Sequence, residues 1–184
     1  MRIVLLGSDD VRSHPLVAIA RDDGHEFVEG SAPDGEAIWW LGDGAGDPDR
    51  EAVAAVAKGV GDAGLPFLGC GTGQLALAEA LGGACEGTVG QGARTVLLTE
   101  AGATGVLLDG VAEPVRLSGG PAKQVTRLPD GARCMASSDL CDVEAMLWGT
   151  RAFSTHAPLC ATEGFDEVAA ERIYINWFQA AARA

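Results

Sequence analysis

Apolar and polar positions alternate along the first half of the chain in blocks that predict strands followed by helices. The first predicted helix ends where Gly24 can act as a C-cap. The second opens at Asp47-Pro48-Asp49, with acidic residues in its first turn. Such alternation is typical of a parallel sheet covered by helices on both faces. Strands are predicted at residues 2–6, 25–28, 37–41 and 65–68, and helices at residues 15–21, 47–62 and 75–81.

After Gly83 the pattern changes to short apolar runs separated by Gly, Pro and Asp, which predict a β-rich C-terminal half. Phe165 to Ala182 then reads as an amphipathic helix, with Ile173 and Trp177 on its apolar side. The length is enough for one sizeable core, so we expect residues 1–184 to form a single domain. Strands in this half are predicted at residues 95–99, 114–117, 124–128, 133–137 and 143–148.

The turn after Leu68 has the pattern of a nucleophile elbow, a sharp strand-to-helix turn that presents one reactive side chain. Such a turn needs small residues two positions before and two after the reactive one, because its strained backbone passes close to its neighbours. Gly69 and Gly73 occupy those two places around Gly71. The position that is predicted to carry the chemistry therefore has no side chain.

The charge balance excludes two classes of partner. The chain has 13 Lys and Arg against 26 Asp and Glu, which gives a formal net charge of −13. An acidic surface repels phosphate backbones and anionic lipids, so we expect neither nucleic-acid nor membrane partners. No apolar run approaches the length of a membrane span and no signal-peptide pattern follows Met1, so we expect a cytoplasmic protein.

Cysteine and histidine usage predicts neither a disulfide framework nor a metal site, and we expect no cofactor. The five cysteines include no C-x-x-C pair, which fits reduced thiols. Only three histidines are present. The cysteines are Cys70, Cys85, Cys134, Cys141 and Cys160, and the histidines are His14, His25 and His156.

The segment from Pro66 to Gly83 resembles the elbow of the class I glutamine amidotransferase family, which reads Pro-Val-Leu-Gly-Ile-Cys-Leu-Gly-x-Gln-Leu-Leu-Ala-Glu-Ala-Leu-Gly-Gly. Here Pro66-Phe67-Leu68-Gly69-Cys70-Gly71-Thr72-Gly73-Gln74-Leu75, continuing to Ala78-Glu79-Ala80-Leu81-Gly82-Gly83, follows it without a gap. Shorter matches lie at residues 41–49 and 128–141, and Phe153 to Pro158 is similar to the family's Gln-Phe-His-Pro-Glu. The resemblance implies a flavodoxin-like α/β fold with a mainly parallel central sheet.

The resemblance also implies where the family's catalytic residues would fall. In the family a cysteine attacks the carboxamide of glutamine, a histidine transfers its protons and a glutamate orients that histidine. On this chain the three places hold Gly71, His156 and Pro158, so we expect a degenerate triad without glutaminase activity. The Trp-His segment that many relatives carry ahead of the Leu-Pro turn is replaced by residues 118–123, Ser-Gly-Gly-Pro-Ala-Lys.

A second alignment would restore the nucleophile, because Cys70 and Gln74 reproduce the family's Cys-x-x-x-Gln spacing. It needs one deletion and one insertion inside a buried strand-turn-helix. Each of these reverses a strand side chain or rotates the helix by about 100°. In the first alignment Cys70 is instead a small thiol packed at the end of a strand.

Further residues are candidates for binding a ligand at the elbow pocket. The amides of Thr72 and of the Gly42-Asp43 loop could bind developing negative charge, as the family's oxyanion hole does. His156 is either a general acid-base catalyst, which acts without activating a nucleophile at position 71, or an inherited residue that is hydrogen-bonded or solvated and has no catalytic role. Asp43 is a catalytic or binding carboxylate or a turn residue, and Glu163 is a candidate to replace the lost acid. Gly71 and Gln74 are also expected to line the ligand-binding pocket.

Three functions therefore remain open. The domain binds a small molecule, or transforms it without a covalent intermediate, in a pocket enlarged by the missing side chain of Gly71, for example in a specialised biosynthesis. Alternatively it docks on a partner enzyme, as glutaminase domains dock on synthetases, or it pairs as a homodimer. In the third reading it is an active glutaminase that uses Cys70.

Overall fold

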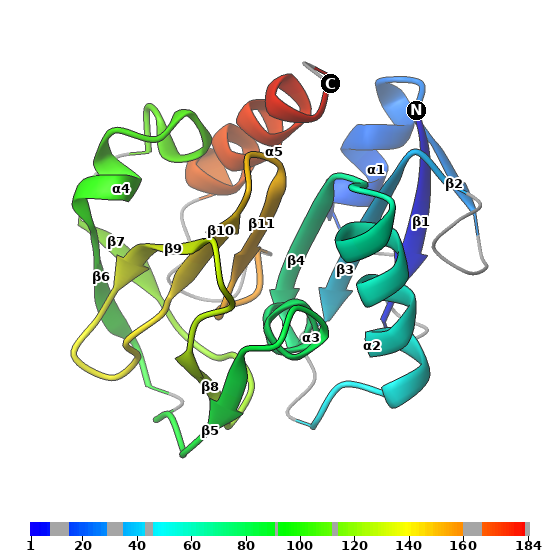
Figure 1. Cartoon of the computed structure of the whole chain (residues 1–184). Helices are drawn as coiled ribbons and strands as arrows, with labels where there is room; N and C mark the ends of the chain where they lie inside the picture. The colour runs from blue at the N-terminus through cyan, green and yellow to red at the C-terminus, as the bar shows by residue number, and fades with distance from the viewer. Residues whose placement is uncertain are drawn as a thin grey trace.

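The structure is a computed structural model of the chain, and it describes residues 1–7, 15–28, 35–42, 46–90, 92–111, 114–159 and 167–182. A nine-stranded sheet forms its centre, with the strand order β2-β1-β3-β4-β11-β10-β9-β6-β7 (Figure 1). The expected mixed α/β fold with a large central sheet is confirmed. Within the described residues, no helix is both long and apolar enough to cross a bilayer.

The sheet has a parallel part and an antiparallel part, which meet at β11. Every neighbouring pair from β2 to β11 is parallel, and every pair from β11 to β7 is antiparallel. The parallel part comprises β2 (Glu26–Val28), β1 (Arg2–Leu6), β3 (Ala37–Gly42), β4 (Phe67–Gly71) and β11 (Ala152–Thr155). The antiparallel part comprises β10 (Ala145–Trp148), β9 (Ala132–Ser137), β6 (Arg94–Leu98) and β7 (Val115–Leu117). A separate small sheet pairs β5 (Ala84–Glu86) with β8 (Gln124–Arg127).

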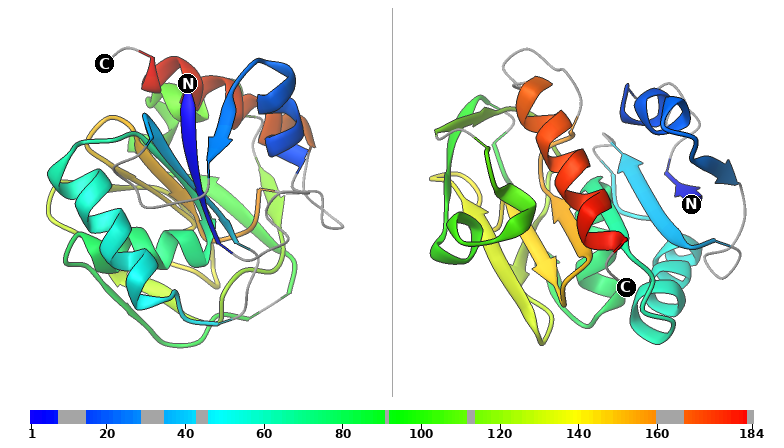
Figure 2. Two further views of the ribbon diagram at one scale, coloured as in Figure 1. Left: turned by 90° about the vertical axis from the view of Figure 1, so that its right-hand side faces the viewer. Right: turned by 90° about the horizontal axis from the view of Figure 1, so that it is seen from above.

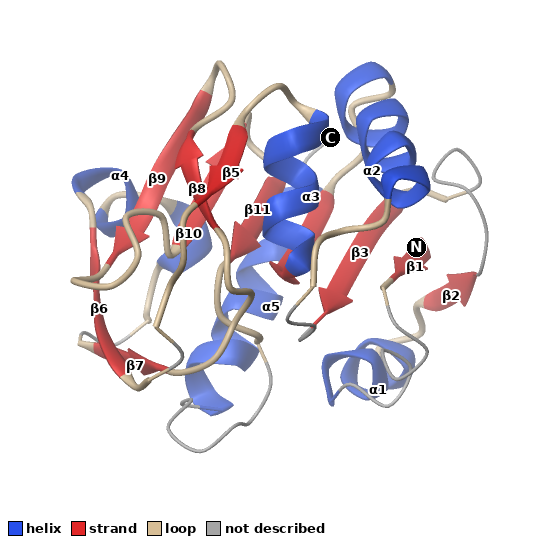
Figure 3. Ribbon diagram, turned by 90° about the horizontal axis from the view of Figure 1, so that it is seen from below, coloured by secondary structure: helices blue, strands red, loops and turns tan. Residues whose placement is uncertain are grey.

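Helices cover both faces of the sheet (Figures 2 and 3). One face carries α1 (Pro15–Asp22) and α5 (Glu167–Ala181), and the other carries α2 (Arg50–Val56), the π-helical η3 (Ala57–Asp62) and α3 (Thr72–Ala80). The short α4 (Glu100–Ala103) and the 3₁₀-helical η4 (Val106–Leu108) follow β6. The sheet is therefore the middle layer of three.

Strand alternation divides the core between the two faces. In β3, Trp39 packs with α1 and α5, whereas Trp40 packs with α2 and α3. Trp177 of α5 is fully buried, and its indole N–H donates to the carbonyl of Phe67 in β4 at 2.8 Å. This bond fixes α5 against the strand that leads to the elbow.

Several element bounds differ from the sequence predictions. The strand predicted at 65–68 begins at Phe67 and continues through Gly71, so the helix follows it directly. The helix predicted at 47–62 begins after Asp49, whose carboxylate caps the N–H of Glu51 at 3.0 Å, and its second half is π-helical. Four short elements, β5, α4, η4 and β11, were not predicted because three or four residues carry too little periodicity.

We expect Gly73→Ala to destabilise the fold, because a Cβ at Gly73 would lie 2.5 Å from the carbonyl oxygen of Trp40. Relieving such an overlap with backbone costs about 1–3 kcal/mol of the free energy of unfolding. Gly61→Ala is the matched control, since its Cβ would make an ordinary 3.5 Å contact with Leu81 inside a helical segment. That control should be neutral or stabilising by up to about 1 kcal/mol in urea unfolding. Equal unfolding midpoints for the two variants would contradict the close approach.

Candidate functional site

Three strands that lie side by side bring the motifs of the sequence to one edge of the sheet. Gly42 at the end of β3 pairs with Gly71 at the end of β4, and Cys70 pairs with Thr155 at the end of β11. Because the three strands are parallel, their carboxyl ends meet at the same edge (Figure 1). Gly42, Gly71 and His156, the residue after β11, are thus neighbouring strand ends.

Gly71 adopts the backbone conformation that a sharp strand-to-helix turn requires. Its φ of 59° and ψ of −122° lie in a region that strongly favours glycine, and it is the N-cap of α3. The glycines on either side are closely packed: a Cβ at Gly69 would overlap the ring of Phe67, and one at Gly73 would overlap Trp40. The close backbone approach expected of an elbow is therefore present, and the residue at its apex has no side chain.

Cys70 points away from the helix that begins at the elbow. It is 1% exposed and belongs to the core that includes Leu41 and Leu68, on the face covered by α1 and α5. The helix α3 lies on the opposite face. The thiol is therefore part of the protein interior.

His156 is fully buried, and both of its ring nitrogens have hydrogen-bond partners. Nη2 of Arg94 lies 3.0 Å from Nδ1, and the carbonyl oxygen of Lys123 lies 3.0 Å from Nε2. A guanidinium can only donate, so Nδ1 accepts and Nε2 carries the proton that is donated to Lys123. His156 is held as a single neutral tautomer.

The surroundings of His156 disfavour its charged form. Burial is the main cause that holds the pKa of His156 below its ordinary value of 6.5, and the charge of Arg94 acts in the same direction. The hydrogen bonds to the carbonyls of Lys123 and Pro121 and the charge of Glu144 oppose this shift without overcoming it. In a catalytic triad, by contrast, a carboxylate bonded to the ring stabilises the imidazolium.

The carboxylate that lies nearest in this network is engaged by Arg94. Glu144, in the segment before β10, accepts two hydrogen bonds from Arg94. Nε of Arg94 donates to one carboxylate oxygen, and Nη2 donates to the other at 3.0 Å. Both side chains are buried. Ser138 also donates to Glu144 at 2.7 Å, and the backbone N–H of His156 donates to the Glu144 carbonyl at 2.8 Å. Arg94 and Glu144 therefore form a bidentate ion pair that holds His156 through its Nδ1 and its backbone N–H.

Cys141, Glu144 and His156 have ligand-type atoms within 4.8 Å of one another. Arg94 already donates to both Glu144 and His156, and so supplies the positive charge of this cluster. Burial and the charge of Glu144 raise the pKa of Cys141 to about 12, which keeps its sulfur protonated and a poor metal ligand. The donor and acceptor groups of this cluster fit the guanidinium of Arg94 better than a metal ion.

A loop without regular structure, residues 118–123, covers His156; we call it the cover segment. Gly120 lies so close that a Cβ there would be 2.8 Å from Nδ1 of His156, whereas a Cβ on Gly119 would be 4.0 Å from Cδ of Pro158. Both glycines have positive φ, 74° at Gly119 and 114° at Gly120. Lys123 closes the segment with an ion pair of 2.7 Å to Asp47, between β3 and α2.

The remaining candidate residues divide into two groups. Thr72 and Gln74 are buried in the first turn of α3, and the side-chain amide of Gln74 has no hydrogen-bond partner among the described residues. Asp43 and Glu163 lie outside the described residues. The structure thus brings Gly42, Gly71 and Thr72 to one edge with His156, while Cys70 faces the core.

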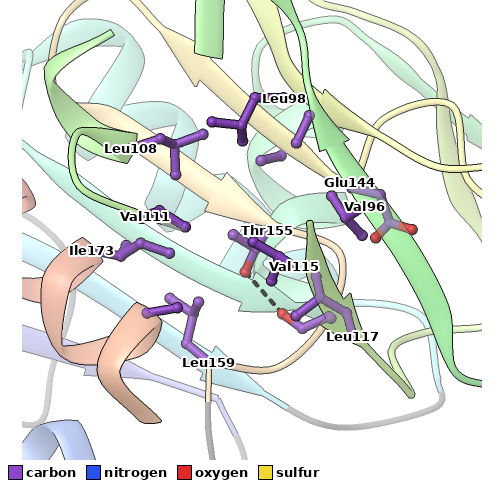
Figure 4. Close-up of a pocket in the computed structure, with 14 residues that line it drawn as sticks. Val96, Leu98, Leu108, Val111, Val115, Leu117, Glu144, Thr155, Leu159 and Ile173 are labelled. Atoms are coloured by element: carbon purple, nitrogen blue, oxygen red, sulfur yellow. Dashed lines mark hydrogen bonds between the residues drawn. The ribbon is translucent and has the colours of Figure 1, made fainter. Parts of the chain in front are cut away.

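An apolar cavity of about 40 Å³ lies behind this network, between the antiparallel strands and α5 (Figure 4). Glu144 and Thr155 are the polar side chains at its wall, and Thr155 donates to the carbonyl of Ala157 at 2.8 Å. The other lining residues are aliphatic, including Val96, Leu108 and Ile173. The cavity is on the face opposite α3 and is separate from the elbow.

Arg94 and Glu144 were not singled out from the sequence. They are 50 residues apart and belong to no motif. The signal that could have found them is a charged residue at the edge of an apolar run, as in Val143-Glu144-Ala145-Met146-Leu147. A charge that must be buried needs a partner, and Arg94 opens an apolar strand.

The lowered pKa of His156 predicts a pH dependence of stability. The unfolded chain binds this proton near pH 6.5, and the folded chain binds it only at lower pH. The stability contributed by the neutral ring is therefore complete above pH 6.5 and is lost below it, by up to about 1.4 kcal/mol for each pH unit. His156→Gln can keep both hydrogen bonds and does not titrate. Urea unfolding should show a steeper loss for the wild type between pH 7 and 5.5, whereas equal slopes would contradict the assignment.

Comparison of the sequence with protein families and with curated proteins finds no match. Solved structures do resemble it. A protein from Thermoplasma acidophilum that is described as a GMP synthase subunit is 17% identical, with a TM-score of 0.78 over 100% of this chain and 94% of that one. A glutamine amidotransferase from Methylobacillus flagellatus is 12% identical, with a TM-score of 0.77 over 98% of this chain and 94% of that one. A glutamine amidotransferase from Thermotoga maritima is 13% identical, with a TM-score of 0.68 over 99% of this chain and 84% of that one. The chain therefore has the fold of glutamine amidotransferase-like proteins.

Proposed function

We propose that this protein is an amidotransferase-like domain with a degenerate triad that binds a small molecule at the elbow edge and does not hydrolyse glutamine. One observation carries the proposal: Gly71 has the conformation of the elbow residue, and His156 beside it accepts a hydrogen bond from Arg94 instead of donating one to a carboxylate. Among the residues that the structure describes, the apex of the turn carries no thiol and His156 offers no free proton acceptor.

The size of the lost catalysis supports this proposal. In protease triads, removal of the nucleophile costs about a millionfold in rate and removal of the orienting acid about ten-thousandfold. Gly71 and Pro158 stand at the corresponding places of this chain. Losses of that size remove any measurable covalent turnover.

Cys70 is a weak substitute for the missing nucleophile. Its side chain is 1% exposed and packs on the face of α1 and α5, so a substrate at the N-terminus of α3 does not meet the sulfur. Bringing it to the turn would shift β4 by one residue and exchange the faces of the sheet on which Phe67 and Leu68 pack. Both of these side chains are fully buried as the strand stands.

His156 can act on a ligand only after one of its nitrogens is released. In the present arrangement Nδ1 faces a cation and Nε2 faces the Lys123 carbonyl. Ligand binding is therefore the primary function at this edge, and any proton transfer by His156 depends on movement of the cover segment.

A docking role is the second candidate, and two exposed leucines favour it. Leu97 is 55% exposed beside a groove of about 400 Å³ that also contains Arg94 and Ser138, and Leu140 is 40% exposed nearby in the chain. The Thermoplasma acidophilum neighbour is described as a synthase subunit, which is consistent with a partner enzyme for this chain too. Such a role predicts a stable complex that survives His156→Gln and is lost in Leu97→Asp.

We expect purified protein to release no ammonia from L-glutamine above the rate of a buffer control, and His156→Ala to be equally silent. Cys70 should also resist an electrophilic glutamine analogue, as measured by intact-mass analysis of the folded protein. Turnover together with a label that disappears in Cys70→Ala would contradict the proposal and identify a glutaminase. The same assay after partial unfolding in urea controls for the reactivity of the thiol itself.

A further inference from the structure

We propose that the apolar cavity between the antiparallel strands and α5 is a binding site for a small aliphatic molecule, and that such an occupant stabilises the end of β11 beside His156. The cavity lies on the face of the sheet opposite α3. The inference therefore goes beyond the ligand proposed for the elbow edge and does not depend on it.

The walls of the cavity are aliphatic. Every lining residue except Glu144 and Thr155 is Ala, Val, Leu or Ile (Figure 4). The two polar side chains already have partners, since Thr155 donates to the carbonyl of Ala157, and Glu144 accepts from Arg94 and Ser138. A buried water needs about two to four polar partners, and these walls leave it little to bind. The chemistry of the walls therefore favours an apolar occupant.

The size of the cavity limits what can occupy it. Its volume is about 40 Å³. A group the size of a water molecule needs about 10–15 Å³, so the cavity holds about three such groups. Xenon and cyclopropane are small enough, whereas a cavity that binds benzene has a volume of about 150 Å³. An occupant supplies the dispersion contacts that wall atoms facing an empty space lack.

The cavity adjoins the backbone that positions His156. Thr155 and Ala157, the residues on either side of His156 in the chain, both line it, as does Glu144. The backbone N–H of His156 donates to the Glu144 carbonyl at 2.8 Å, which joins the end of β11 to the segment before β10. An occupant contacts residues on both sides of this bond. It therefore opposes a local opening that breaks the bond and disrupts the cavity.

A small molecule can reach the cavity at the edge of the sheet. Three lining residues, Leu98, Val111 and Val115, are only half-buried. Val115 belongs to β7, which has three residues and is the last strand of the sheet. A short edge strand opens locally at little cost in free energy, so an occupant can enter without unfolding of the core.

The test records methyl ¹H–¹³C NMR spectra of the full chain equilibrated with xenon at increasing pressure. Ala169→Val narrows the cavity, because Ala169 lines it from α5. Ala170→Val is the matched control, since Ala170 is the next residue of the same helix and is buried but does not line the cavity. Circular dichroism confirms that each variant is folded.

We expect xenon to shift the methyl signals of Leu108 and Ile173 with saturation in the wild type and in Ala170→Val, and to leave Leu77 on the opposite face unchanged. In Ala169→Val the shifts should be lost. Leu108→Ala provides a second test, because it enlarges the cavity. Benzene should raise the unfolding temperature of Leu108→Ala and not that of the wild type.

Amide hydrogen exchange tests the effect on His156. At half-saturation with xenon, exchange of the His156 N–H should slow about twofold, because the free ligand concentration then equals the dissociation constant. The same N–H in Ala169→Val should exchange at an unchanged rate. The N–H of Gly83, which bonds to Ala78 at the end of α3 on the other face, should also keep its rate in the wild type.

Several results would overturn the inference. Xenon that shifts no lining methyl group, or shifts them equally in Ala169→Val, would show that the cavity is not a binding site, and so would a Leu108→Ala variant that benzene does not stabilise. Equal slowing of His156 and Gly83, or no slowing of His156, would overturn the effect on β11. Ammonia release from glutamine would instead overturn the proposed function and leave this inference intact.

Discussion

The arrangement of this site depends on the contact between Arg94 and Nδ1 of His156. A guanidinium is always protonated and never accepts a hydrogen bond, so its position decides which ring nitrogen carries the proton. The proton is then directed at the Lys123 carbonyl, and the ring stays neutral in a buried site. A histidine held in this way stabilises the fold at the end of β11, whereas a triad histidine must be free to accept a proton.

The buried ion pair beneath His156 is stable only because its hydrogen bonds are nearly complete. Isolated charges at 3% and 1% exposure would be strongly unfavourable, but Glu144 receives two bonds from Arg94 and one from Ser138. Removing either partner would leave the other charge buried and unpaired, at a cost of about 3–5 kcal/mol. The antiparallel half of the sheet therefore carries a polar network that fixes His156, the residue that follows β11 of the parallel half.

The sequence predicted the part of the site that is local in the chain. Gly69, Gly71 and Gly73 lie within one strand-turn-helix, and the short spacing is enough to indicate the close packing that the structure shows. Four of the five strands of the parallel half were also predicted to within about three residues, since apolar runs of this length are clear, whereas β11 was recognised only as part of a motif and not as a strand. The network around His156 was not, because Arg94 and Glu144 meet only through the order of strands β6, β9 and β10. A pairing across 50 residues leaves no periodic signal.

The most direct test of the contact between Arg94 and His156 is the protonation state of His156, measured by ¹⁵N NMR of the histidine side chains from pH 8 to 5. If Arg94 fixes the tautomer, His156 is an Nε2-protonated neutral ring at neutral pH, with a midpoint below the ordinary pKa of 6.5. His156→Gln assigns the signal. A ring protonated at Nδ1, or one that becomes charged above pH 6.5, would show that Arg94 does not hold it and that a catalytic base survives at the elbow.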